Sequence, residues 1–394
     1  MSQAQKLIIL HGLLQDELVS ALAAADYDKV SCLLAQNLRL SAPVADPAGT
    51  YLLRLLLQDA NFLACRAAQG KPLAPTLLAA YAAEVAVLQS WLAAYNTPSW
   101  LADDAAAPAA DLPQNLLNWR NLPADEVAVR MIDFHRNFGF GQLALHRVWR
   151  WQGALQPVVG FDNIRLTDLI GYQHQKDEVM NNTRLFVQHG RGNNMLLYGA
   201  RGTGKSSLIK AVANELAADG LCLVELPLDY IADLPHLQAL LKDQPRHYII
   251  YIDDLSFEKA DQSYKITKAV LEGSVTARGG NVLIYATSNR RHLIVENWQD
   301  RDGVQHNNGE VRASDSMSEK LSLADRFGQT VLFTTPRQDE YLNIVSALAA
   351  ADGITLPPAQ LREQALQWAL WQNGCSGRTA RQFVNSLINN QEEV

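Results

Sequence analysis

The feature that most constrains this chain is a glycine-rich run, Gly199-Ala200-Arg201-Gly202-Thr203-Gly204-Lys205-Ser206, which matches the pattern G-x-x-x-x-G-K-[ST] completely. An apolar segment that we predict as a strand, Met195–Tyr198, precedes the run. A segment with apolar residues at helical spacing, from Leu208 to Leu216, follows it. A strand, a tight glycine-rich turn and a helix in this order make a loop whose N–H groups converge on phosphate. The run therefore predicts a phosphate-binding loop in a fold that combines strands and helices.

Each residue type in this run has a physical reason to be there. Gly199, Gly202 and Gly204 let the backbone curl so that successive N–H groups face phosphate oxygens. The N-terminus of the following helix adds its partial positive charge. We expect Lys205 to reach the β- and γ-phosphates of a nucleotide and the Ser206 hydroxyl to bind Mg²⁺. The structural alternative is a chance glycine-rich turn, and the flanking strand and helix argue against it.

Two neighbouring carboxylates follow another predicted strand. Asp253 and Asp254 come directly after the apolar run Tyr248–Ile252. Because a carboxylate is costly to bury without a cation, two of them at the end of a buried strand indicate a metal site. Asp253 suits Mg²⁺, directly or through water, and Asp254 suits the polarisation of an attacking water. The structural alternative is a pair of helix-capping residues at the strand end.

Short β-branched and aliphatic runs alternate with helical patterns between residues 156 and 335. Five of these runs are predicted to be buried strands: Met195–Tyr198, Leu221–Leu226, Tyr248–Ile252, Val282–Ala286 and Thr330–Thr334. The alternation predicts an α/β domain with a parallel five-stranded sheet and helices on both faces.

The chain on either side of this domain has helical patterns. Residues 1–155 are rich in Ala and Leu, and segments such as Tyr51–Leu57, Leu77–Leu92 and Leu143–Trp151 carry apolar residues at helical spacing. We predict an all-helical N-terminal domain here and a small helical domain over residues 336–394. Five aromatic residues of the N-terminal domain are expected to pack between helices rather than to form a binding face: Tyr81, Trp91, Tyr95, Trp100 and Trp119. Phe138–Gly141 is expected to be a bend.

Composition excludes several classes of protein. The 34 basic and 41 acidic residues give a net charge of -7, so no constitutive nucleic-acid binding is indicated. No apolar run reaches the roughly 18 residues that a membrane span needs. The four cysteines, Cys32, Cys65, Cys222 and Cys375, are scattered without a C-x-x-C pair, as is typical of reduced thiols. We expect a cytoplasmic protein with no membrane partner.

From about residue 160 to 390 the chain resembles an AAA+ ATPase, and within that superfamily a bacterial family of predicted ATPases of unknown function. The strings that carry the resemblance are Asn193–Tyr198 running into Gly199–Ser207, then Asp253–Phe257, Tyr285–Arg291 and Leu323–Gly328. The resemblance implies a P-loop NTPase core with ATP and Mg²⁺ as its ligands, and it identifies the C-terminal helices as a lid.

The resemblance also assigns roles to residues outside the glycine-rich run. Ile170 and Gly171 match the segment that packs on adenine. Asn289 matches sensor 1, whose amide helps to orient the attacking water; the alternative is a turn residue after a strand. Arg326 matches the arginine finger that is presented to the neighbouring subunit; the alternative is a surface ion pair with Asp325.

Gly377–Val384 resembles the sensor 2 helix of the lid, with Arg378 placed to reach ATP and Arg381 as the reserve candidate. The complete predicted site has catalytic residues (Lys205, Asp254, Asn289, Arg326 and Arg378), metal ligands (Ser206 and Asp253) and nucleotide-binding residues (Ile170, Gly171, Gly199, Ala200, Arg201, Gly202, Thr203, Gly204, Lys205, Ser206 and Ser207).

One residue departs from the common pattern of the superfamily, because Asp254 stands where many AAA+ proteins have Glu. The shorter side chain leaves slow turnover open. Two functions therefore compete: an ATPase that remodels or loads a macromolecular partner, and a nucleotide-gated switch that needs only occupancy. A metabolic kinase is a distant third, since no phosphoacceptor base can be identified.

The resemblance further implies a homo-oligomer, a ring or open ring, with the finger supplied in trans. A protein or protein–nucleic-acid partner is expected to bind through the N-terminal domain. The long polar stretch Arg290–Lys320 is interpreted as a disordered or partly ordered insertion rather than a substrate-contacting loop.

Overall fold

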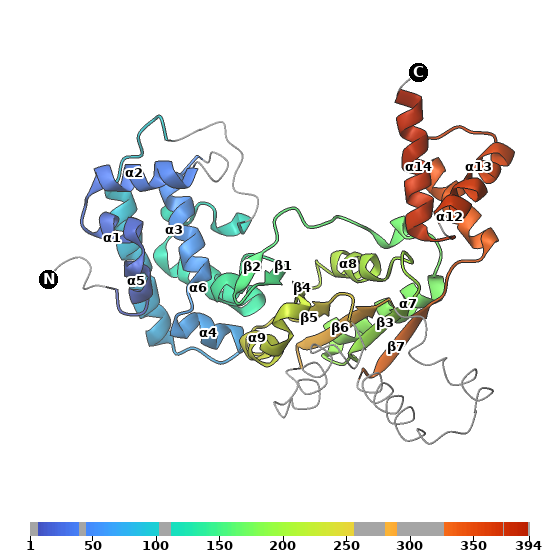
Figure 1. Ribbon diagram of the computed structural model, residues 1–394. Helices are drawn as coiled ribbons and strands as arrows, with labels where there is room; N and C mark the ends of the chain where they lie inside the picture. The colour runs from blue at the N-terminus through green and yellow to red at the C-terminus, as the bar shows by residue number, and fades with distance from the viewer. Residues whose placement is uncertain are drawn as a thin grey trace. The chain divides into compact units, whose positions relative to one another are not determined.

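The computed structural model describes residues 7–38, 45–101, 112–255, 280–289, 327–372 and 374–392 (Figure 1). The chain divides into two compact units. Unit 1 comprises Met1–Arg147 and Asp243–Arg246, and unit 2 comprises Val148–Lys242 and His247–Val394. The three-domain division with boundaries at 155 and 335 stays a prediction.

The described part of unit 1 is helical. Its helices are α1 (Glu17–Ala23), α2 (Tyr27–Leu38), α3 (Pro47–Gln58), α4 (Phe62–Ala68), α5 (Pro75–Ala94) and α6 (Ala124–Phe138), with the short 3-10 turns η2 (His11–Gln15), η3 (Gln114–Leu116), η4 (Trp119–Asn121) and η5 (Gly141–Leu143). Polar side chains set several helix starts. Asp16 accepts the N–H groups of Leu18 and Val19 at the start of α1, and Asp46 accepts that of Gly49 before α3.

The aromatic residues of unit 1 pack largely as predicted. Four of the five are buried, namely Tyr81, Trp91, Tyr95 and Trp119, whereas Trp100 is 67% exposed. The Trp119 indole donates to the Gly49 carbonyl oxygen at 3.0 Å, which satisfies its buried N–H. The predicted bend is also present, because α6 ends at Phe138 and Gly139 has a φ of +91°.

Among the described helices, α5 has the length and apolar composition of a membrane span, which the sequence analysis did not expect. Its buried side chains, including Tyr81, Leu88 and Leu92, belong to the core of unit 1. Most of its exposed positions are alanine, a strong helix former. Core packing therefore accounts for the composition of α5, and the expected absence of a membrane partner stays a prediction.

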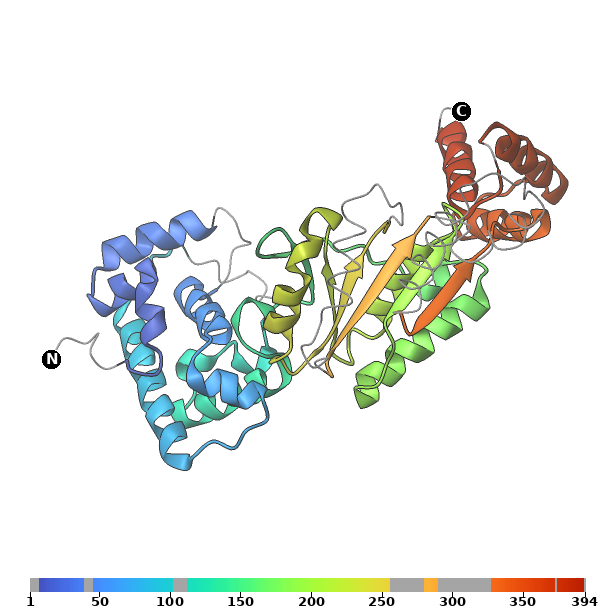
Figure 2. The ribbon, with the colours of Figure 1, turned by 60° about the horizontal axis from the view of Figure 1, so that its bottom comes forward.

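Unit 2 is built on a seven-stranded sheet with the order β2-β1-β4-β5-β6-β3-β7 (Figure 2). The strands are β1 (Val148–Trp151), β2 (Leu155–Pro157), β3 (Met195–Gly199), β4 (Leu221–Glu225), β5 (His247–Ile252), β6 (Val282–Ser288) and β7 (Gln329–Phe333). All five predicted strands are confirmed and run parallel. The prediction of a five-stranded, purely parallel sheet was wrong, because β1 and β2 extend it and β2 is antiparallel.

The helical prediction for Leu143–Trp151 was wrong, because only Leu143 lies in a 3-10 turn and a strand begins at Val148, so the N-terminal region is not all-helical up to residue 155. Val148 pairs with Leu223 in β4, and Arg150 pairs with Glu225. Valine and tryptophan suit a half-buried strand, and a free position beside β4 lets them pair. The stability gained from this strand pairing outweighs the preference for a helix that the local spacing of apolar residues indicates.

Helices α7 (Gln173–His189) and α8 (Lys205–Glu215) lie next to each other along one face of the sheet. Their apolar side chains form one core with alternate residues of β3 to β7. α7 also protects the sheet edge at β7, because Gln175 donates to the Leu332 carbonyl oxygen and Tyr172 to that of Thr334. Two further elements follow β4: the 3-10 turn η7 (Leu228–Asp233) and α9 (Leu234–Leu241).

Three helices complete unit 2, and the helical prediction for this region is confirmed. They are α12 (Gln338–Ala351), α13 (Pro358–Trp371) and α14 (Gly377–Glu392). They enclose a small apolar core of their own, which includes Tyr341, Ala365 and Phe383. We call these three helices the lid.

Candidate nucleotide-binding site

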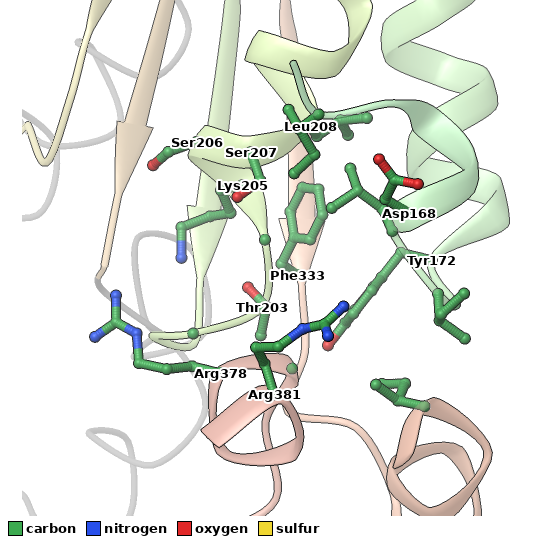
Figure 3. Close-up of a pocket in the computed structure, with 18 of the residues that line it drawn as sticks. Asp168, Tyr172, Thr203, Lys205, Ser206, Ser207, Leu208, Phe333, Arg378 and Arg381 are labelled. Carbon is green, nitrogen blue, oxygen red and sulfur yellow. The ribbon is translucent and has the colours of Figure 1, made fainter. Parts of the chain in front are cut away.

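A cavity of about 930 Å³ lies where the glycine-rich loop, the acids after β5 and the start of α14 come together (Figure 3). The segment around the 3-10 turn η6 (Leu166–Asp168) closes it on another side. Polar groups after β5 and β6 gather here because the carboxyl ends of parallel strands meet at one edge of a sheet. The predicted site residues that line it are Ile170, Gly171, Arg201, Gly202, Thr203, Gly204, Lys205, Ser206, Ser207, Asp253, Asp254, Asn289, Arg378 and Arg381.

The glycine-rich loop has a backbone that only glycine adopts readily. Gly199, Gly202 and Gly204 have φ values of +130°, +73° and +87°. A Cβ atom on Gly199 would lie 2.1 Å from the carbonyl oxygen of Phe333. A side chain at Gly199 would therefore force β3 and β7 apart. Helix α8 begins at Lys205, so its free N–H groups lie at the cavity.

Lys205 is only 5% exposed, and backbone carbonyl groups hold its ammonium group. Its Nζ donates to the carbonyl oxygens of Gly199 at 3.2 Å and Ala200 at 2.7 Å. Burial lowers the pKa of Lys205 to about 8; the carboxylates after β5 oppose this shift, and Arg201 and Arg378 add to it. A phosphate in the cavity would supply negative charge that raises this pKa again.

Asp253 accepts three hydrogen bonds at one carboxylate oxygen. Its Oδ1 accepts from the Ser206 hydroxyl at 2.9 Å, the Thr287 hydroxyl at 2.5 Å and the Asp254 N–H at 3.1 Å. Burial alone would raise the pKa of Asp253, but the hydroxyls of Thr287, Tyr251 and Ser206 outweigh it, so this pKa lies below its usual value.

The donor set around Asp253 fits Mg²⁺. A hydroxyl and an ionised carboxylate lie within hydrogen-bond distance of each other beside the phosphate-binding loop. Mg²⁺ prefers oxygen ligands and is usually held by one or two protein groups together with water and phosphate oxygens. The described residues form no group of three or more His, Cys, Asp or Glu side chains that could hold a metal alone.

Asp254 adopts a left-handed backbone conformation, with a φ of +52°. Two hydrogen bonds fix this turn: the Asp254 N–H donates to the Thr287 hydroxyl at 3.0 Å, and the Leu255 N–H donates to the Thr287 carbonyl oxygen at 2.7 Å. The amide of Asn289 donates to Asp254 Oδ1 at 2.7 Å. The structure thus brings the predicted second acid and the predicted sensor 1 into direct contact.

The lid is connected to the loop through its last helix. The Arg378 N–H donates to the Gly202 carbonyl oxygen at 3.1 Å. The Arg378 side chain extends to the same side of the cavity as Lys205, whereas Arg381 turns the other way (Figure 3). Arg381 forms an ion pair with Asp352 at 2.6 Å. These placements favour Arg378 over Arg381 as the residue that reaches a phosphate.

The other end of the cavity is apolar and suits a planar base. Ile170 and Gly171 line it together with Phe333 of β7 and with Ile344 and Leu348 of α12. Phe333, Ile344 and Leu348 were not among the predicted site residues. Their positions follow from lid packing, for which the sequence carries no local signal.

Sequence analysis also missed Thr287, which is buried beside Asp253. A signal for it exists, because Thr287 lies two residues before Asn289 and residues at this spacing share one face of a strand. Gly199 and Ala200 take part through their carbonyl oxygens rather than as lining residues. Arg326 and the polar stretch 290–320 lie outside the described residues.

Beside β3 lies β6, which is followed by Asn289, and beyond β6 lies β5, which is followed by the two acids. The glycine-rich loop between β3 and α8, together with this strand order, defines the class of fold as that of a P-loop protein. Residues 144–391 match the family described as "Protein of unknown function (DUF815)". The chain belongs to that family.

Solved structures of RuvB from Thermotoga maritima, described as a Holliday junction branch migration motor, are similar to this chain at 15% identity and a TM-score of 0.38. A variant of the same protein matches at 15% identity and a TM-score of 0.39. The similarity covers 56% of this chain and 63% or 64% of those chains. This chain therefore spans less than two-thirds of their length, and such a likeness carries no inference about activity. No curated protein sequence matches this chain.

Proposed function

We propose that this protein binds ATP with Mg²⁺ and hydrolyses the bond between the β- and γ-phosphates. The observation that carries the proposal is the convergence of Lys205, Asp253, Asp254 and Asn289 on one cavity from three separate segments of the chain. A structural ion-pair network would place partners around each charge, whereas Lys205 lies against carbonyl groups at a helix N-terminus. Such an arrangement is suited to binding a phosphate anion.

Each group has a task in the proposed reaction. The loop N–H groups and Lys205 bind the phosphates, and Ser206 and Asp253 hold Mg²⁺. When bound, Mg²⁺ would neutralise charge on the phosphate oxygens. Asp254 accepts a proton from the attacking water, and Asn289 orients that water. Arg378 reaches the phosphates from the lid, and Arg326, by resemblance, reaches them from a neighbouring subunit.

We further propose that hydrolysis is coupled to remodelling or loading of a macromolecular partner. A nucleotide-gated switch remains the second candidate, and one observation favours it. The Asn289 amide already occupies one oxygen of Asp254, which leaves the other to take the proton from water. Asp254 shares one oxygen with Asn289 and is one methylene shorter than Glu, and both features favour slow turnover.

Asp254→Asn tests the hydrolysis step. Asn has the shape of Asp and tolerates a left-handed backbone, so the variant should fold and bind ATP normally while its phosphate release falls to background. Lys205→Ala is the matched control, because it should lose ATP affinity about 10- to 150-fold instead. If Asp254→Asn retained the full rate of an active wild-type preparation, the proposed catalytic role would be wrong.

Arg326→Ala tests the assembly. Mixed with Lys205→Ala, this variant should regain part of the activity, because an intact finger then meets an intact phosphate site. Specific activity should also rise with protein concentration. Turnover that is independent of concentration, together with no recovery on mixing, would contradict a finger in trans and favour a monomeric switch.

A further inference from the structure

Three hydroxyl groups surround the Asp253 carboxylate, and the nucleotide-binding motifs account for only that of Ser206. The second belongs to Thr287 on β6. The third belongs to Tyr251, which lies two residues before Asp253 and therefore points to the same face of the sheet.

The Thr287 hydroxyl both donates and accepts a hydrogen bond at this point. Its hydroxyl donates its proton to Asp253 Oδ1 at 2.5 Å and accepts the Asp254 N–H at 3.0 Å. Because a hydroxyl has one proton, this pair of bonds fixes its rotation. Asp253 Oδ1 then has three donors, and among the described residues no hydrogen bond to Oδ2 is formed, so Oδ2 is the oxygen that can face a metal or a metal-bound water.

The Tyr251 hydroxyl is buried but has no hydrogen-bond partner of normal geometry among the described residues. The side chain is 3% exposed. Asp253 lies close enough that, after burial, its charge is the next cause of a raised pKa for this phenol. Buried polar groups nearly always have a partner, so this hydroxyl needs one.

We propose that Thr287 and Tyr251 are positioning residues of the magnesium site, which fix the Asp253 carboxylate so that Oδ2 faces the metal. Thr287 anchors Oδ1, and the Tyr251 hydroxyl donates to the carboxylate from the buried side. The inference rests on the proposed binding of ATP with Mg²⁺. It goes beyond that proposal because it assigns metal affinity to two side chains that contact neither nucleotide nor metal.

The neighbouring strand offers a matched control. Tyr285 pairs in register with Tyr251 and is equally buried, but its hydroxyl bonds to Thr183 at 2.7 Å and to Asn182 at 2.9 Å. Tyr285→Phe therefore removes a buried hydroxyl from the same layer without touching Asp253. It reports what the loss of such a group does to the fold alone.

The experiment is calorimetric titration of the full chain with ATP, once with excess Mg²⁺ and once with excess EDTA. The quantity of interest is the factor by which Mg²⁺ strengthens ATP binding. Tyr251→Phe and Thr287→Val should each reduce this factor about 10- to 100-fold, with the affinity in EDTA unchanged. Thr287→Ser keeps the hydroxyl and should preserve the factor. Tyr285→Phe should lower the melting temperature but leave the factor for Mg²⁺ unchanged.

The outcomes separate the inference from the proposed function. If Mg²⁺ did not change the ATP affinity of the wild type, both the inference and the proposed function would be overturned. A wild type that depends on Mg²⁺, together with an unchanged factor in Tyr251→Phe and Thr287→Val, would overturn the inference and leave the proposed function intact. A factor that falls equally in Tyr285→Phe would also overturn it, because the effect would then come from the fold.

Discussion

ATP binding should weaken about tenfold between about pH 7 and about pH 9, because Lys205 loses its proton over this interval. In the protein without nucleotide, burial lowers the pKa of Lys205 from its usual 10.5 to about 8. Well below this pKa the lysine is charged before and after binding, so pH has no effect. Above it, binding must first protonate the lysine, and the affinity falls as the charged fraction of the free protein falls.

The magnitude follows from the charged fraction. With a pKa of about 8, Lys205 is about nine-tenths charged at pH 7 and about one-tenth charged at pH 9. The ratio of the two fractions is about ten, which corresponds to about 1.4 kcal/mol of binding free energy. The nucleotide contributes little to this change, since phosphate groups with a second pKa near about 6 are ionised across most of the interval.

Calorimetry measures both the affinity and the proton that binding takes up. At about pH 8, titrations in two buffers with different ionisation enthalpies should show an uptake of about half a proton per ATP. Lys205→Arg is the control, because a guanidinium stays charged and its profile should be flat even if its affinity is lower. A flat profile and no proton uptake in the wild type would refute the reasoning.

Three further predictions concern other parts of the chain. Glu84→Gln should lower the free energy of unfolding by about 1–3 kcal/mol, measured in urea, because the buried carboxylate accepts the N–H groups of residues 8–10 at 2.9–3.0 Å; an unchanged midpoint would contradict this. Gly202→Ala should weaken ATP binding in a folded protein, because φ is +73° and a Cβ atom would lie 3.0 Å from the hydroxyl of Ser376, the residue before α14; wild-type affinity in calorimetry would contradict this prediction. Asp254→Glu should lose about 1 kcal/mol of stability in thermal melts, since the left-handed position disfavours Glu. Its phosphate release should not be faster than that of the wild type, and faster release would contradict this prediction.

The five strands β3 to β7 could be predicted because each is a short apolar run between polar breaks, and β3 and β5 are buried along almost their whole length. The strands β1 and β2 escaped prediction for a different reason. Residues 148–151 resemble a helical segment when read alone, and only the free edge of β4 makes them a strand. Pairing between segments far apart in the chain outweighed the local pattern, as it does most often at sheet edges.

The same distinction applies to the candidate site. The residues of the glycine-rich run are adjacent in the sequence, so their pattern is visible there. Thr287, Phe333 and Leu348 reach the cavity only through strand register and lid packing. The preference for Arg378 over Arg381 likewise depends on how α14 meets the loop, which helical spacing alone does not determine.

The backbone at Asp254 links the fold to the choice of acid. In a regular strand, consecutive side chains point to opposite faces, so two adjacent acids could not line one cavity. The left-handed turn after β5, with its φ of +52°, removes this restriction, and Asp253 and Asp254 both line the cavity. Among residues with a side chain, Asp and Asn tolerate such a backbone best. The geometry that brings the second carboxylate to the site is therefore one that Asp tolerates better than Glu, and the hydroxyl and carbonyl oxygen of Thr287 hold the turn that produces it.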